Sequence, residues 1–254
     1  MIGGTGTDEH GQVTLIPINA AGDDSFMPSV VVAPIEITDN VATDIDSFVT
    51  QLPRSAVRGA RVVPGTQQGL YGATGEAVEC DVSAAANYLD ARRDRSVQWA
   101  QAINVAAERI PYYLNTLTPA VLTADTWVTA FAPGEGHPAS RQAVLQAGNA
   151  VLIDQVGVPR MHCATGNPLG PPANVNLASL AVNGKRWQGF DQQGVIAIAY
   201  SGGGSEAPVV DEFVLRNLST GEVITRPAGK TIDIGVDPTG WSPDPAAMNV
   251  PPAS

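Results

Sequence analysis

Apolar residues recur at helical spacing through one long region of this chain, residues 81–117. Asp81 or Ser83 can accept a hydrogen bond from the first turn of a helix that ends near residue 91. A second helix follows it, and Pro111 can occupy the first turn of a third, because that position needs no backbone N–H donor. The pattern therefore predicts a central helical segment.

Strand patterns lie on both sides of this helical segment, with one further helix expected at residues 44–52. Runs rich in β-branched and aromatic residues are typical of strands. These runs cover residues 13–18, 30–37, 121–131, 143–146, 150–154, 158–163, 195–200, 212–217 and 222–226. Turns ending at Gly157 and Gly221 predict two hairpins. We therefore predict an α+β fold in which the central helices pack against an antiparallel, hairpin-rich sheet.

Composition divides the chain into three parts. Residues 1–53 carry eight acidic residues and no Lys or Arg, and residues 238–254 are rich in proline. We expect an acidic, linker-like N-terminal segment with strands suited to a sheet edge, a single α+β domain at residues 54–237, and a poorly structured tail. A transmembrane helix is not predicted, because no run of about 18 apolar residues occurs.

The charge balance excludes some partners. The 254 residues include 14 basic and 25 acidic side chains, which gives a formal net charge of −11. Nucleic-acid binding draws on clustered Lys and Arg, so we expect no nucleic-acid partner, and an anionic membrane surface is disfavoured for the same reason. The acidic runs lack the loop pattern of calcium sites, and the cysteines lack the spacing of zinc sites. No metal and no cofactor are expected.

Cys80 and Cys163 are the two cysteines of the chain. Their even number is compatible with a disulfide, which requires an oxidising compartment, and also with two separate buried thiols. Adjacent residues on a strand point to opposite faces, so His162 and Cys163 are not expected to converge on one catalytic or metal centre.

A hydrolase is an alternative that rests on Ser201, which follows an apolar run and precedes glycines. His137, Asp154 and Ser201 also stand in the chain order of chymotrypsin-like enzymes. The residues after Ser201 favour a loop, however, where a nucleophile elbow needs a helix. Order alone is common by chance, so this alternative stays behind a binding role.

Short blocks of distinctive residues follow one another between residues 69 and 190. The blocks are Gly69-Leu-Tyr-Gly72, Cys80-Asp81, Leu117-Thr-Pro119, Ala124-Asp-Thr126, Arg141-Gln-Ala-Val-Leu-Gln-Ala-Gly148, Ala150-Val-Leu-Ile-Asp154, Gly157-Val-Pro-Arg160, Cys163, Gly166-Asn-Pro-Leu169 and Trp187-Gln-Gly-Phe190. In order and spacing they resemble the signature of an uncharacterised actinobacterial family of domains of unknown function. The hairpin at residues 220–227 resembles the C-terminal end of that family.

The family is similar to parts of lipoproteins and to the outer side of membrane-anchored proteins. The resemblance therefore implies an extracytoplasmic position in the cell envelope, with membrane attachment only through an N-terminal anchor outside this chain. Members often carry a second cysteine two residues after the position of Cys163, where this chain has Thr165. That departure leaves Cys163 as the one candidate partner of Cys80 and implies a disulfide. The resemblance implies no reaction.

We therefore expect a non-enzymatic, extracytoplasmic domain that binds an envelope protein or a small ligand. The glycine-bounded loops near residues 69–75 and 166–172 are candidate binding loops, because special loops on a rigid scaffold often carry function. The alternative, slightly favoured by the sequence, is that these loops serve only to close the fold around a disulfide. The candidate residues are Tyr71, Gly72, Asn167, Pro168 and Trp187. An accessory subunit of a cell-surface assembly is a further alternative.

Overall fold

The computed structural model describes residues 11–18, 20–22, 24–32, 35–75, 77–199 and 209–248. Fourteen strands of these residues form one sheet. Their bounds are β1 (Gln12–Ile16), β2 (Arg54–Ser55), β3 (Ala60–Pro64), β4 (Tyr71–Ala73), β5 (Thr118–Leu122), β6 (Thr126–Ala132), β7 (Ala139–Leu145), β8 (Ala150–Ile153), β9 (Pro159–His162), β10 (Asn167–Gly170), β11 (Ala181–Asn183), β12 (Ile196–Ala199), β13 (Glu212–Asn217) and β14 (Val223–Pro227). The protein is therefore mostly β.

The strand order is β11-β1-β7-β6-β10-β9-β8-β5-β4-β13-β14, while β12 pairs with β3 and β6, and β2 pairs with β3. Pairings of β1 with β7 and β11, of β12 with β3 and β6, and of β13 with β4 are parallel. The prediction of an antiparallel sheet is wrong in this respect. Segments distant in sequence return beside earlier strands in the same direction, which local patterns do not reveal. The coarser α+β assignment holds.

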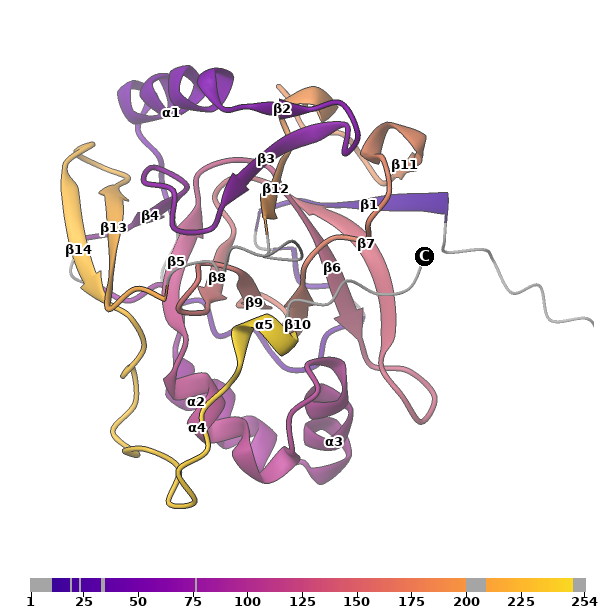
Figure 1. Ribbon diagram of the computed structural model, residues 1–254, viewed down its shortest axis with the longest axis vertical. Helices are drawn as coiled ribbons and strands as arrows, with labels where there is room; N and C mark the ends of the chain where they lie inside the picture. The colour runs from indigo at the N-terminus through magenta and orange to yellow at the C-terminus, as the bar shows by residue number, and fades with distance from the viewer. Residues whose placement is uncertain are drawn as a thin grey trace, which may run out of the picture.

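In Figure 1 the first helix lies at the top, the next three lie together at the bottom, and the last lies in the middle of the view. They are α1 (Asp39–Gln51), α2 (Val82–Asp90), α3 (Arg93–Ala102), α4 (Ile110–Asn115) and α5 (Pro245–Met248), with short 3-10 turns η2 (Ala107–Arg109), η3 (Leu177–Ser179) and η4 (Gln192–Gly194). The carboxylate of Asp81 accepts a hydrogen bond from the Ala84 amide and caps α2. Helices α2 to α4 confirm the predicted central helical segment.

Local patterns predicted the hairpins more accurately than the single strands. The β8–β9 and β13–β14 hairpins are both present. The run predicted as one strand at residues 121–131 is instead divided between β5 and β6, since Thr123 to Asp125 turn the chain. The run at residues 30–37 supplies only an isolated bridge between Val31 and Cys80 among its described residues.

Helices α2 to α4 cover one face of the sheet around a buried cluster. Trp99 of α3 and Leu114 of α4 are fully buried there, in the same cluster as Leu152 of β8. The Trp99 indole donates a hydrogen bond to the carbonyl of Gly166, 2.9 Å away, which fixes α3 to the turn before β10. No helix of the described residues is long and apolar enough to span a membrane.

Part of the acidic N-terminal segment is integrated into this core. Strand β1 lies between β7 and β11, and the side chains of Phe26 and Met27 are buried. The Val30 amide donates to the carbonyl of Cys163 at 3.0 Å, and the Val30 carbonyl accepts from the Asp81 amide at 2.8 Å. Residues 26–32 therefore lie across the two elements that carry the cysteines.

Candidate functional site

A cleft of about 490 Å³ opens beside helix α1, where the β5–β6 and β7–β8 turns meet the loop before η4. Its volume falls within the range of about 300 to 1,000 Å³ that is typical of small-ligand sites. The residues that line it are Asp46, Val49, Thr50, Thr123, Ala124, Asp125, Gln146, Ala147, Trp187, Gln188, Gly189, Asp191 and Gly194. We define this set as the Asp125–Trp187 cleft.

Asp125 stands at the centre of this set because it ends the β5–β6 turn, one residue before β6. Its Oδ1 accepts a hydrogen bond from the Ala147 amide at 2.9 Å, and its Oδ2 accepts one from the Trp187 indole at 3.1 Å. Its carbonyl accepts from the Ile196 amide at 2.8 Å. Two separate segments thus orient the carboxylate, and a third holds the backbone of the same residue.

Burial raises the pKa of the Asp125 carboxyl above its usual value. The hydrogen bonds from Ala147 and Trp187 lower it in part, and the negative charge of Asp46 raises it further. A carboxylate has room for about four hydrogen bonds, so two donors leave it able to accept more. Asp125 can therefore still accept a hydrogen bond from a ligand, and a donor there would relieve its desolvation.

The aromatic side of the cleft is formed by the loop that follows β11. The half-buried Trp187 packs edge-on against Phe190, with ring centroids 5.1 Å apart. Asp191 then caps η4 by accepting a hydrogen bond from the Gln193 amide at 3.0 Å. The loop thus presents an aromatic ring and a carboxylate to the same cavity.

The charge of the cleft has one sign. Asp46, Asp125 and Asp191 line it, whereas none of its lining residues is Lys, Arg or His. An anionic ligand would meet repulsion there, and a ligand with N–H or O–H donors would meet acceptors. Within the described part of the chain, no group of three or more His, Cys, Asp or Glu side chains is arranged to hold a metal ion.

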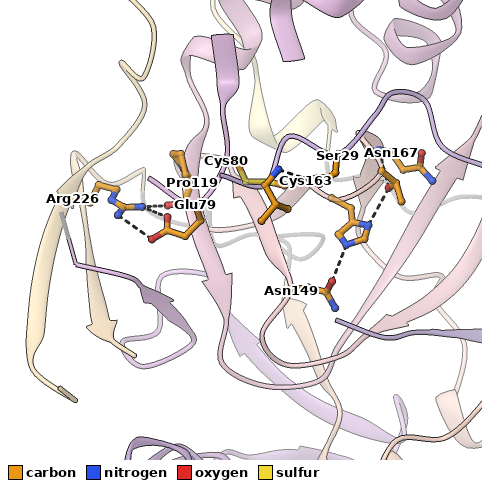
Figure 2. Close-up of a disulfide and its surroundings, with 11 residues drawn as sticks. Ser29, Glu79, Cys80, Pro119, Asn149, Cys163, Asn167 and Arg226 are labelled. Carbon is orange, nitrogen blue, oxygen red and sulfur yellow. Dashed lines mark hydrogen bonds and ion pairs between the residues drawn. A yellow bond between two sulfur atoms is a disulfide. The ribbon is translucent and has the colours of Figure 1, made fainter. Parts of the chain in front are cut away.

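Cys80 and Cys163 form a disulfide, with their Cα atoms 5.9 Å apart. Both residues are buried, and the backbone of residues 26–32 bonds to Cys163 and to the two neighbours of Cys80. Figure 2 shows the disulfide. The disulfide implied by the family resemblance is therefore present. His162 points away from it, since its ring nitrogens contact Thr165 and Asn149.

The other residues singled out from the sequence do not gather at one place. Tyr71 and Gly72 are buried in β4, and a Cβ on Gly72 would approach a Leu218 methyl carbon at 2.4 Å. Asn167 and Pro168 are buried in β10, several strands away in the sheet order. Only Trp187 lines the cleft. The segments predicted as loops contain these short strands, and their binding role stays a prediction.

The proposed hydrolase nucleophile, Ser201, lies outside the described residues. Of its two companions in chain order, His137 is exposed in the β6–β7 loop. Asp154 is buried and pairs with Arg160 at 2.7 Å, and its Oδ1 accepts from the amides of Val156 and Val158. These contacts give Asp154 a structural role in the β8–β9 turn.

Asp125 is the residue that reasoning from the sequence missed. It belongs to the block Ala124-Asp-Thr126, which supported the family resemblance without being assigned a role. A signal was present, because a lone acidic residue between two strongly apolar strands needs a hydrogen-bonding partner or a solvent-filled cavity. The partner, Trp187, is 62 residues further along the chain.

Comparison with known proteins adds a family and no activity. The model of a family described as a domain of unknown function (DUF6777) matches residues 61–229. This range includes both cysteines, Asp125 and Trp187, while Asp46 precedes it. Neither the curated proteins nor the solved structures contain a match.

Proposed function

The chain belongs to the DUF6777 family of domains of unknown function, and we propose that it is a non-enzymatic, extracytoplasmic domain that binds a small ligand. The ligand site in this proposal is the Asp125–Trp187 cleft. The single observation that carries it is a half-buried carboxylate, held by two donors, that lines a cavity beside an aromatic ring. Fixed polar groups in an otherwise formed cavity are what small-ligand sites use to orient a ligand.

The chemistry of the cleft favours an organic amine. Three carboxylates supply acceptors and negative charge, and the Trp187 ring supplies an aromatic surface for the apolar part or the cationic group of a ligand. Its lining residues include no Ser, Cys or His. Its two threonine hydroxyls are engaged, since Thr50 donates to the Ser47 carbonyl and Thr123 lies within bonding distance of the carbonyls of Gly69 and Leu70. This composition supports binding more than covalent catalysis.

The disulfide supports the extracytoplasmic part of the proposal. Disulfides persist mainly in oxidising compartments and are rare in the reducing cytosol. The further elements, an actinobacterial cell envelope and an N-terminal lipoprotein-like anchor outside this chain, come from the resemblance described above. They belong to the proposal and fit a domain that receives its ligand outside the cell.

Binding can be measured through tryptophan fluorescence, because Trp187 donates directly to Asp125. We expect putrescine, a small diamine, to change the emission saturably, and glucose and succinate to bind at least about ten-fold more weakly. Asp125→Asn should weaken putrescine binding by about ten-fold or more, since it removes a charge-assisted hydrogen bond. Trp187→Phe should remove most of the signal.

Glu135→Gln is the matched control, because it removes one negative charge from the β6–β7 loop, at the opposite end of β6 from Asp125. It should leave putrescine affinity within about two-fold of the original. Equal affinity of Asp125→Asn and the unmodified chain would refute the assignment of the site. Tight binding of glucose would show that the ligand is a neutral polyol and not an amine.

The location is tested separately, in the native host, by fractionation with an antiserum and by mass spectrometry without reductant. We expect the protein in the envelope or extracellular fraction, with Cys80 and Cys163 joined. Recovery from the cytosol with two free thiols would contradict the extracytoplasmic proposal without bearing on the cleft.

A further inference from the structure

A second cavity, of about 180 Å³, lies beneath the chain that follows β1. Its wall comes from β1, β6, β7, β9 and β10 and from described residues between Pro17 and Asp24. The residues that line it are Thr14, Leu15, Ile16, Pro17, Ala20, Gly22, Asp24, Ala130, Arg141, Leu145, His162, Thr165, Asn167 and Leu169. We define this set as the Arg141 pocket. Most of its surface is apolar, and it shares no residue with the Asp125–Trp187 cleft.

The Arg141 pocket carries one cationic side chain whose donors are only partly used. Arg141 Nη1 lies 2.9 Å from Asp24 Oδ2, but the Asp24 side chain is 62% exposed and that of Arg141 is 28% exposed. Such an exposed pair contributes little, because water competes for both charges. The buried Nε of Arg141 has no hydrogen-bond partner among the described residues. A better acceptor than Asp24 would therefore be stabilised at this guanidinium.

The inner end of the pocket adds polarity without charge. His162 is buried, with its Nε2 2.9 Å from Asn149 Oδ1 and its Nδ1 3.0 Å from the Thr165 hydroxyl (Figure 2). Burial lowers the pKa of His162 to about 4, so the ring is neutral near pH 7. The Asn167 side chain is also engaged, by the amide of Phe26 and the carbonyl of Asp24. Asp24 and Arg141 are therefore the charged residues of the lining.

We propose that the Arg141 pocket binds a small amphiphilic carboxylate, whose apolar body fills the cavity while its carboxylate replaces Asp24 at Arg141. The apolar contacts would come from Ile16, Leu145 and Leu169. A dry cavity of about 150 Å³ accommodates benzene, so this pocket suits an apolar body of about five to seven carbons. The planar guanidinium matches a carboxylate with two parallel hydrogen bonds.

Three ligands with the same tail and different heads test the proposal on the complete chain: hexanoate, hexanol and hexylamine. In 15N–1H NMR titrations we expect hexanoate to bind saturably and to shift the Arg141 Nε–H resonance. Hexanol should bind at least about five-fold more weakly, and hexylamine more weakly still, because the head group meets Arg141. No saturable binding of hexanoate up to about 20 mM, a concentration suited to a ligand of so few atoms, would overturn the proposal.

Four variants separate the head-group contact from the cavity. Arg141→Gln should abolish the preference for hexanoate over hexanol, and Asp24→Asn should tighten hexanoate binding about two- to five-fold by removing the competing carboxylate. Ala20→Phe should fill the cavity from a half-buried position and weaken both ligands. Arg93→Gln is the matched control, since Arg93 also has one carboxylate partner at 2.9 Å, on an exposed surface. This variant should bind hexanoate and hexanol with the affinities of the unmodified chain.

Unchanged hexanoate affinity in Arg141→Gln would also overturn the proposal. If Ala20→Phe still bound hexanoate with the original affinity, the ligand would have to bind outside the cavity. Trp187→Phe should leave hexanoate binding as it is, because that residue lines the other cleft. The outcome is therefore independent of whether the Asp125–Trp187 cleft binds amines.

Discussion

Arg226 Nη1 lies 2.6 Å from Glu79 Oε2 and 2.6 Å from the carbonyl of Pro119, although the Glu79 side chain has no exposed surface (Figure 2). Glu79 Oε1 also accepts from the amide of Thr74 at 2.8 Å. The contact joins the residue before Cys80 to the last strand of the sheet. A buried ion pair of this kind tolerates the loss of one partner poorly, because the other charge stays in the interior.

Replacing Arg226 with Met should lower the free energy of unfolding by about 3 to 5 kcal/mol, since it leaves the Glu79 carboxylate buried without a cation. The double variant Glu79→Gln/Arg226→Met should recover part of that loss. Urea denaturation followed by circular dichroism measures both. Arg93→Gln breaks an exposed pair and should leave the urea midpoint unchanged. If Arg226→Met also left the midpoint unchanged, the buried pair would not be important for stability.

Removing the disulfide should destabilise the protein through its unfolded state. The cysteines are separated by 83 residues, and on the chain-entropy estimate such a loop contributes about 4 to 5 kcal/mol. The double variant Cys80→Ala/Cys163→Ala should lose stability on this scale in urea denaturation without reductant. The unmodified chain in excess reductant is the comparison. A loss below about 1 kcal/mol would show that the reduced chain stays equally constrained.

Stability should depend on pH through His162. Its pKa is lowered by burial from 6.5 to about 4, so between these values the unfolded chain binds more protons than the folded one. The contribution of His162 to the free energy of unfolding is therefore complete above about pH 6.5. It falls by about 3 kcal/mol in total as the pH drops towards 4. This total takes each pKa unit as about 1.4 kcal/mol of free energy. Urea denaturation midpoints measured between pH 7.5 and 4 test the dependence.

The matched variant is His162→Gln. It should be less stable than the unmodified chain at pH 7.5, because it disturbs the contacts with Asn149 and Thr165. Its stability should nevertheless fall less steeply with decreasing pH through this range. An identical slope in both proteins would assign the pH dependence to other groups.

Two glycines with the same backbone handedness separate conformational strain from steric contact. Gly136 has φ 82° with nothing within 4 Å of an added Cβ, whereas Gly157 has φ 76° and a Cβ there would lie 2.1 Å from the Gly65 carbonyl oxygen. Gly136→Ala should cost about 1 to 2 kcal/mol, the ordinary penalty of a left-handed residue. Gly157→Ala should cost clearly more, as thermal denaturation would show. Equal costs would contradict the close approach of the two turns.

Local signals predicted what depends on neighbouring residues. Asp81 before an apolar helical pattern located the start of α2, and the turn at Gly157 located the β8–β9 hairpin. The parallel placement of β1 beside β7 joins Val13 to Gln142, and nothing in either run encodes that register. Long-range pairing depends on the summed packing of the whole sheet, so the mixed topology could not be derived from the patterns.

The candidate sites also depend on contacts between distant segments, which local sequence patterns do not predict. Trp187 was singled out, but its partner Asp125 was not, because their proximity is created by a loop that returns to the β5–β6 turn. The Arg141 pocket likewise combines β7 with a segment more than a hundred residues earlier, through Asp24. Residue types alone indicated which chemistry was present, and only the fold showed which side chains share a cavity.

Residues 26–32 limit the access of other thiols to the disulfide. Their backbone bonds to Cys163, Glu79 and Asp81 cover a disulfide whose two residues have almost no exposed surface. A thiol or an oxidant must reach a sulfur atom to exchange with it. A thiol can therefore reach the disulfide only after this segment has moved away, so the docked segment protects the bond from exchange.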